Sequence, residues 1–178
     1  ENVAKKIFLN RKNVIFLLLT ALWLALAIFA VSKHEFWRDE VRDLSIARSV
    51  ASPFELVEAT QNEGHPLLWY LLLFAAKSIV DAPWVLPALS ILISLGAVMV
   101  FLFMSSYPLW MKCALIFSSL VLFENTVMAR PYGLSFLLLA VIAALYRNPL
   151  KHPLWLGILL ALLANANVHS AILAGLIG

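Results

Sequence analysis

Charged residues are scarce in this sequence, and the signature motifs of several enzyme classes are missing. Only 13% of the 178 residues are charged, whereas soluble domains have about 25%. The single cysteine excludes a disulfide framework and a thiolate metal site. The sequence has no phosphate-binding loop, no dinucleotide-binding motif and no HExxH motif. The small net charge of +3 does not favour nucleic-acid binding. With 63% hydrophobic residues in long runs, the chain is predicted to be an integral membrane protein.

Apolar runs of about 20 residues, the length that crosses a membrane, recur along the chain. We predict an all-α fold with five transmembrane spans, at residues 14–31, 84–104, 113–129, 132–146 and 154–178. The third and fourth spans form a hairpin, because Pro131 lacks a backbone donor and disfavours helix at Arg130. The run at 66–80 is short and contains Lys77, so we predict that it lies at the membrane surface.

The distribution of basic residues predicts the orientation of the chain in the membrane. Four basic residues precede the first span, which places the N-terminus in the cytoplasm. Residues 32–83 and 124–132 then face outward, while Lys112 and the turn at 147–153 face the cytoplasm.

Within the predicted outer loop at 32–83, residues 32–66 contain seven of the ten acidic residues. We predict two short helices in it, at 39–50 and 53–60, before the interfacial helix at 66–80. The apolar face of the first helix consists of Val41, Leu44, Ala47 and Val50.

Asp39 and Glu40 come just after the first span, at the outer membrane surface. A carboxylate there can act as a general base, and we predict that these two residues are catalytic. Two other interpretations stay open. The carboxylates would also suit a divalent cation, or they would simply stabilise the start of a helix through its dipole.

Arg130 lies at the outer end of the third predicted span, where the positive-inside rule does not explain a cation. Its planar guanidinium suits a phosphate, although a long cation there can also reach the interface without further function. Glu63 and His65 form part of a turn before the interfacial helix. Asn165 and His169 are four residues apart and should share a helix face, for contact with a polar ligand or for interhelical hydrogen bonds.

The order of these motifs resembles the N-terminal half of GT-C membrane glycosyltransferases. It is similar to the bacterial relatives of protein O-mannosyltransferases and of the lipid A aminoarabinose transferase. The motifs are Phe-Trp-Arg-Asp-Glu-Val-Arg at 36–42, Ile-Ala-Arg at 46–48, Gly-His-Pro-Leu-Leu-Trp-Tyr at 64–70, Ala-Arg-Pro-Tyr at 129–132 and Asn-Ala-Asn-Val at 165–168. The resemblance covers about residues 14–170.

The resemblance implies an enzyme of the bacterial inner membrane that works on the cell envelope from the outer face. It would transfer a sugar from a polyprenyl-phosphate carrier to a glycan, lipid or protein acceptor. Asp39 matches the acidic residue that acts as base, with Glu40 beside it. Glu63 and His65 match the region near the carrier phosphate, and Arg130 with Tyr132 matches the phosphate-binding end of a later span.

Two departures from the family pattern stand out. One proline follows His65 where many relatives have two, and the chain has fewer spans than the module that the family shares. We therefore expect a single membrane module that forms the N-terminal part of a longer protein. No cofactor is indicated apart from the divalent cation above. Two other functions stay open, namely a transporter or flippase for a lipid-linked anion and a non-catalytic membrane scaffold.

Overall fold

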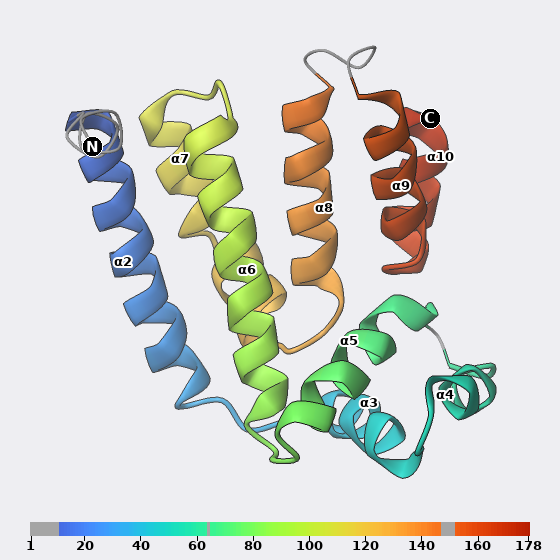
Figure 1. The fold of residues 1–178 in the computed structure, drawn as a ribbon. Helices are drawn as coiled ribbons and strands as arrows, with labels where there is room; N and C mark the ends of the chain where they lie inside the picture. Colours follow the sequence, from blue (N-terminus) through green and yellow to red (C-terminus); the bar gives the residue numbers. More distant parts are fainter. Residues whose placement is uncertain (1–10, 64, 147–151) are drawn as a thin grey trace, which may run out of the picture.

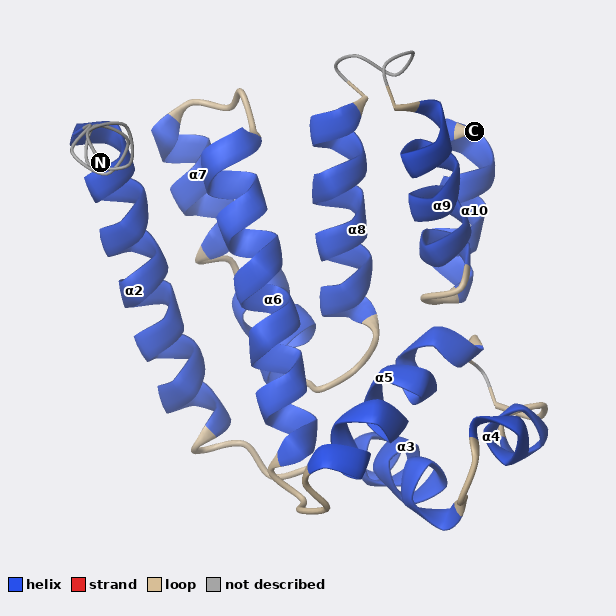
Figure 2. Ribbon diagram, viewed as in Figure 1, coloured by secondary structure: helices blue, strands red, loops and turns tan. Residues whose placement is uncertain are grey.

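The computed structural model describes residues 11–63, 65–146 and 152–178, and all regular elements within them are helices (Figure 2). In chain order they are α2 (Arg11–Val31), α3 (Arg38–Ser49), α4 (Pro53–Ala59), α5 (Leu67–Ile79), α6 (Val85–Met104), α7 (Leu109–Ile116), the π-helix η1 (Leu120–Val127), α8 (Tyr132–Leu145), α9 (Pro153–Ala164) and α10 (Val168–Ile177). The all-α prediction is confirmed for these residues. Most of the predicted inner turn at 147–153 lies outside the described residues, as do Lys5, Lys6 and Gly64.

Two of the described helices, α2 and α6, are long and apolar enough to cross a membrane unaided. With 21 and 20 residues they are about 30 Å long, which matches the hydrocarbon core of a bilayer. They run side by side (Figure 1), and Trp23 and Ala27 of α2 share a buried core with Val98 and Leu102 of α6. These helices coincide with the spans predicted at 14–31 and 84–104, and they identify a membrane protein.

The predicted hairpin is present, but its first arm is bent. α7 and η1 meet at an angle of 41° and would make a third crossing only as one broken span. Two serines of α6 satisfy carbonyl groups near the end of the π-helix, because Ser90 Oγ donates to Thr126 O and Ser94 Oγ to Asn125 O, both at 2.8 Å. The chain turns at 128–131, as Pro131 predicts, and α8 then runs back beside α6 (Figure 1).

Gly133 lies where α8 passes closest to η1. A Cβ at this position would be 2.4 Å from Asn125 O and 2.6 Å from Ser94 Oγ. Gly133→Ala is therefore expected to force α8 away from η1 and to lower the free energy of unfolding by about 1–3 kcal/mol, measured by melting in detergent. Gly157→Ala in α9 is the matched control, because nothing lies within 4 Å of that Cβ and alanine favours helix. Equal destabilisation by both substitutions would contradict this explanation.

The prediction of one span at 154–178 is wrong. α9 and α10 have 12 and 10 residues, so each is far shorter than a bilayer core, and they fold back side by side (Figure 1). The break falls at two asparagines. Asn165 is the C-cap of α9, and the Asn167 side chain caps α10 by accepting a hydrogen bond from Ser170 N at 2.9 Å. Asn167 Nδ2 also donates to Ser135 Oγ of α8 at 2.6 Å, which fixes the turn against the bundle.

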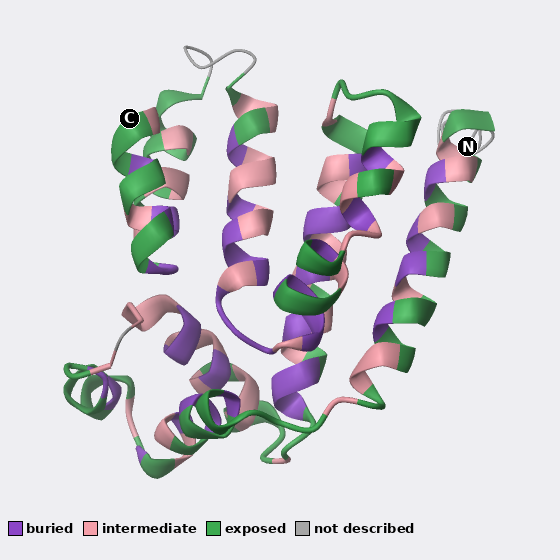
Figure 3. Cartoon of the chain, turned by 180° about the vertical axis from the view of Figure 1, so that it is seen from behind, coloured by how far each residue is buried: buried purple, intermediate pink, exposed green. Residues whose placement is uncertain are grey.

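The three helices α3, α4 and α5 lie together at one end of the bundle, below α8 and α9 in Figure 1. They agree with the helices predicted at 39–50, 53–60 and 66–80. Leu44 and Ala47 of α3 pack with Trp69 of α5 and are buried, and Figure 3 marks the buried turns of both helices. Val41, which was predicted on the same apolar face, is exposed. Asp43 is buried in the interface instead.

Candidate functional site

Three side chains that are far apart in the sequence meet where α3, the turn before α5 and the loop at 128–131 come together. Arg130 Nη1 lies 3.1 Å from Asp39 Oδ2, and Arg130 Nη2 donates a hydrogen bond to His65 Nε2. Only 10% of the Arg130 side chain is exposed, against 56% of the Asp39 side chain. A fixed guanidinium therefore lies beneath a carboxylate that faces solvent.

The contact with Arg130 defines the protonation state of His65. A guanidinium can only donate, so His65 Nε2 accepts and the ring proton belongs on Nδ1. Burial and the charge of Arg130 both lower the pKa of His65, which favours this neutral form. Within the described part of the chain, His65 Nδ1 is buried without a hydrogen-bond partner. The Tyr132 ring packs edge-on against His65, with ring centroids 6.4 Å apart.

Glu40 connects the elements that form this site. It is fully buried, and its two carboxylate oxygens accept hydrogen bonds from Trp37 N at 2.8 Å and Ala129 N at 2.7 Å. His34 Nε2 lies 2.8 Å from the same carboxylate. Glu40 therefore links the start of α3 to the residue that precedes Arg130. Of the two acids predicted to be catalytic, Asp39 is the one that faces solvent.

Glu63 lies on the other side of α3 from Glu40 and binds Arg42. Arg42 donates to Glu63 Oε1 from Nη2 at 2.7 Å and from Nε at 3.1 Å. This pair ties the turn that contains His65 to α3, one turn of helix from Asp39. Glu63 thus belongs to the same cluster, as a partner of α3 rather than of Arg130.

Asp43 is a site residue that the sequence analysis missed. It is 2% exposed and accepts hydrogen bonds from Trp69 Nε1 at 3.2 Å and Tyr70 OH at 3.0 Å. Burial raises the pKa of Asp43 to about 6, although Arg130 and the two aromatic donors oppose the shift. Its position next to Leu44 and four residues before Ala47 was the available signal, because it puts Asp43 near the buried side of α3.

The raised pKa of Asp43 predicts a pH dependence of stability. The folded protein binds this proton more tightly than the unfolded chain, in which the usual value is 3.8. Stability should therefore fall as pH rises from about 4 to about 6, by up to about 3 kcal/mol. Asp43→Asn should remove this decline, and melting temperatures in detergent at several pH values would show it. Asp81→Asn, at an exposed aspartate, is the control, and an equal effect there would contradict the assignment.

Asn165 and His169 are not part of the cluster. The break in the helix separates them, so the prediction that they share one helix face is wrong, and both side chains are exposed. Asn167 and Ser170 are the buried residues at this turn, and both contact Ser135 Oγ, at 2.6 and 2.8 Å. In the described part of the chain, no hydrogen bond or ion pair joins this turn to Asp39, His65 or Arg130.

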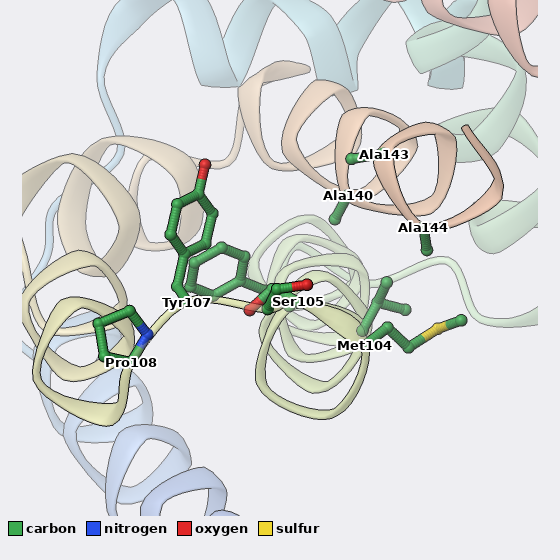
Figure 4. Close-up of a pocket in the computed structure, with 10 residues that line it drawn as sticks. Met104, Ser105, Tyr107, Pro108, Ala140, Ala143 and Ala144 are labelled. Carbon is green, nitrogen blue, oxygen red and sulfur yellow. The ribbon is translucent and has the colours of Figure 1, made fainter. Parts of the chain in front are cut away.

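The Asp39 side chain faces solvent, and the described part of the chain also has cavities. Figure 4 shows one of about 440 Å³, lined by Met104, Tyr107 and Ala140 at the opposite end of α6 from α3. Among the described residues, no group of three or more His, Cys, Asp or Glu side chains is placed to hold a metal ion.

These contacts define a cluster with one exposed carboxylate, one buried guanidinium and one neutral imidazole. The carboxylate can accept a proton, and the other two groups can bind an anion. A comparison with known protein families found no match, and neither did comparisons with curated proteins and with solved structures.

Proposed function

We propose that this chain is a glycosyltransferase that takes its sugar from a polyprenyl phosphate on the outer face of the membrane. The observation that carries the proposal is the contact of Arg130 with both Asp39 and His65. A phosphate ester and an acceptor hydroxyl or amine need two different groups, an anion-binding cation and a proton acceptor. Here the two lie side by side at the end of a membrane bundle. The resemblance of the motif order to GT-C enzymes supports the same function.

The ion pair suggests how donor binding prepares the base. A carrier phosphate bound to Arg130 competes with Asp39 for the guanidinium, which frees the carboxylate to accept the proton of the acceptor. The acceptor oxygen or nitrogen then forms a bond to the anomeric carbon as the bond to the phosphate oxygen breaks. Both electrons of that bond leave with the polyprenyl phosphate, whose charge Arg130 and the Nδ1–H of His65 stabilise. Direct displacement inverts the anomeric centre.

For the topology, we place α3–α5 and the loop at 128–131 outside a bacterial inner membrane. The support is that both lie at one end of the bundle, whereas the loop between α6 and α7 lies at the other, with the start of α2 (Figure 1). α2, α6, the bent α7–η1 pair and α8 then cross, and α9–α10 forms a hairpin that enters from the inner side. A cysteine at position 62, in a Cys113-free background, should react with an impermeant reagent from outside, and one at 107 should not.

The decisive experiment is mass spectrometry of lipid-linked sugars and their acceptors in cells with and without the intact gene. Loss of the gene should make one polyprenyl-phosphate sugar accumulate and one glycosylated acceptor disappear. Complementation with the wild-type gene should return the donor to its normal level and bring back the glycosylated acceptor. Complementation with Asp39→Asn should do neither. Unchanged donors and acceptors in the deleted cells would overturn the proposal.

A further inference from the structure

Glu40 is the third residue of α3, and its two carboxylate oxygens have different partners. Oε2 accepts a hydrogen bond from Trp37 N at 2.8 Å, which is the usual bond from such a glutamate back to the residue before its helix. Oε1 accepts from Ala129 N at 2.7 Å, and Ala129 is 89 positions further along the chain. One oxygen therefore caps a helix, and the other binds a distant loop.

Glu55 has the same position in α4, and it shows what a helix cap alone requires. It accepts from Ala51 N at 2.9 Å and from Ser52 Oγ at 3.0 Å, so both of its partners are local. Glu55 is exposed, whereas Glu40 is fully buried. Burial of a carboxylate is costly unless donors compensate for the lost water. Because an exposed glutamate caps α4 equally well, capping does not explain why Glu40 is buried.

A third donor to Glu40 comes from the segment between α2 and α3. His34 Nε2 lies 2.8 Å from Glu40 Oε2, and because an ionised carboxylate only accepts, this nitrogen carries a proton. Only 8% of the His34 side chain is exposed, and its ring packs edge-on against Phe123 of η1, with ring centroids 6.0 Å apart. Glu40 thus joins the segment after α2, the start of α3 and the loop after η1.

The bond between Glu40 and Ala129 lies one residue away from the ion pair of the site. Glu40 follows Asp39, and Ala129 precedes Arg130. The bond therefore joins the same two segments as the pair between Arg130 Nη1 and Asp39 Oδ2, which are 3.1 Å apart. Ala129 is fully buried, so water does not compete for its N–H. A shift between the two segments would separate the guanidinium from the carboxylate.

We infer that Glu40 is a positioning residue, which holds the 128–131 loop against α3 so that the guanidinium of Arg130 stays in contact with Asp39 and His65. The Glu40 side chain is completely buried, so it acts through Arg130 and not on a substrate. Its importance for donor binding rests on the proposed function. The placement of Arg130 can be measured without any substrate.

The test is an NMR titration of His65 in the purified chain in detergent, with His65→Gln to assign its signal. Burial and the charge of Arg130 lower the pKa of His65 below its ordinary value of 6.5. In Glu40→Gln the side-chain amide cannot accept at both ends, so the loop should move and the pKa of His65 should rise. Arg130→Ala should also raise it, and the double variant should match Arg130→Ala. The direct effect of removing a negative charge has the opposite sign, because it would lower this pKa.

Glu55→Gln is the matched control, because it changes the same residue type at the same helix position, where both partners are local. It should leave the pKa of His65 unchanged. Hydrogen exchange of the wild type covers the case in which Glu40→Gln does not fold. The Ala129 amide should exchange at least about tenfold more slowly than in an unfolded peptide. An unchanged or lower pKa of His65 in folded Glu40→Gln, an equal rise in Glu55→Gln, or an unprotected Ala129 amide would each overturn the inference.

Donor binding separates this inference from the proposed function. Glu40→Gln should weaken binding of a polyprenyl-phosphate sugar about tenfold, the lower end for a hydrogen bond to a charged group. It should cause no further loss in the Arg130→Ala background, because it acts through Arg130. Additive losses would indicate general destabilisation and overturn the inference. A wild type that binds no donor would overturn the proposed function, whereas the titration of His65 would still decide whether Glu40 positions Arg130.

Discussion

Asp39→Asn is expected to lower the proposed glycosyl transfer by about 100-fold or more, because it removes the proposed proton acceptor without changing the shape of the side chain. Donor binding should be unchanged or stronger in this variant. Asp39 is the carboxylate that pairs with Arg130 at 3.1 Å, so its loss leaves the guanidinium to the carrier phosphate. A fall in turnover together with undiminished affinity distinguishes a base from a binding residue. Both would be measured in nanodiscs that contain a polyprenyl-phosphate sugar.

Asp81→Asn is the matched control for this substitution. Asp81 is also an exposed aspartate paired with an arginine, because its Oδ1 lies 2.5 Å from Arg48 Nε. The control removes the same charge at the same end of the bundle but outside the cluster. It should retain wild-type turnover. Equal turnover by Asp39→Asn and wild type would exclude Asp39 as the base, and an equal loss in Asp81→Asn would point to net charge instead.

Much of the helix order could be predicted because it depends on local properties of the chain. Apolar runs of sufficient length predict α2 and α6, and the missing donor of Pro131 predicts the turn before α8. The apolar spacing at 41–50 and the helix-start pattern at 52–55 predict the short helices α3 and α4 in the same way. Each of these features depends only on consecutive residues, and the structure has the predicted helices at these positions.

The break between α9 and α10 could not be found from hydropathy. Two asparagines in a long apolar run lower its average very little. What stops the helix is the capping bond from Ser170 N to Asn167 and the bond from Asn167 to Ser135 of α8. The second of these depends on a helix that lies elsewhere in the sequence. For this reason, the hydropathy pattern predicts one continuous helix where the structure has two.

The site illustrates a similar limit. The sequence indicates Asp39, His65 and Arg130 as polar residues at one membrane face, but it does not say that they touch. Nor does it say which acid of α3 faces solvent. Glu40 and Asp43 flank Asp39 closely in sequence, yet backbone donors of the 128–131 loop and side chains of α5 bury them. Which acids of one helix are exposed and which are buried therefore depends on the residues that pack against the helix.

Arg130→Ala is expected to weaken binding of the polyprenyl-phosphate sugar by about 1.5–3 kcal/mol, the range for a hydrogen bond to a charged group. Arg130→Lys should keep the charge but bind more weakly than wild type. The reason is geometric, because Arg130 contacts Asp39 and His65 through two different nitrogens, whereas lysine offers a single ammonium. A residue that only anchors a helix at the interface would tolerate lysine without loss.

Affinity for the carrier lipid in nanodiscs measures these effects, and melting in detergent verifies that each variant is folded. Arg48→Ala is the control, since Arg48 also lies at this end of the bundle and pairs with an aspartate, but outside the cluster. It should bind the donor like wild type. The charge of Arg130 also lowers the pKa of Asp43, so Arg130→Ala should move the pH-dependent decline in stability to higher pH. Equal donor affinity in wild type, Arg130→Lys and Arg130→Ala would show that Arg130 only anchors the helix at the membrane. The proposal of a phosphate-bearing donor would then lose its main structural support.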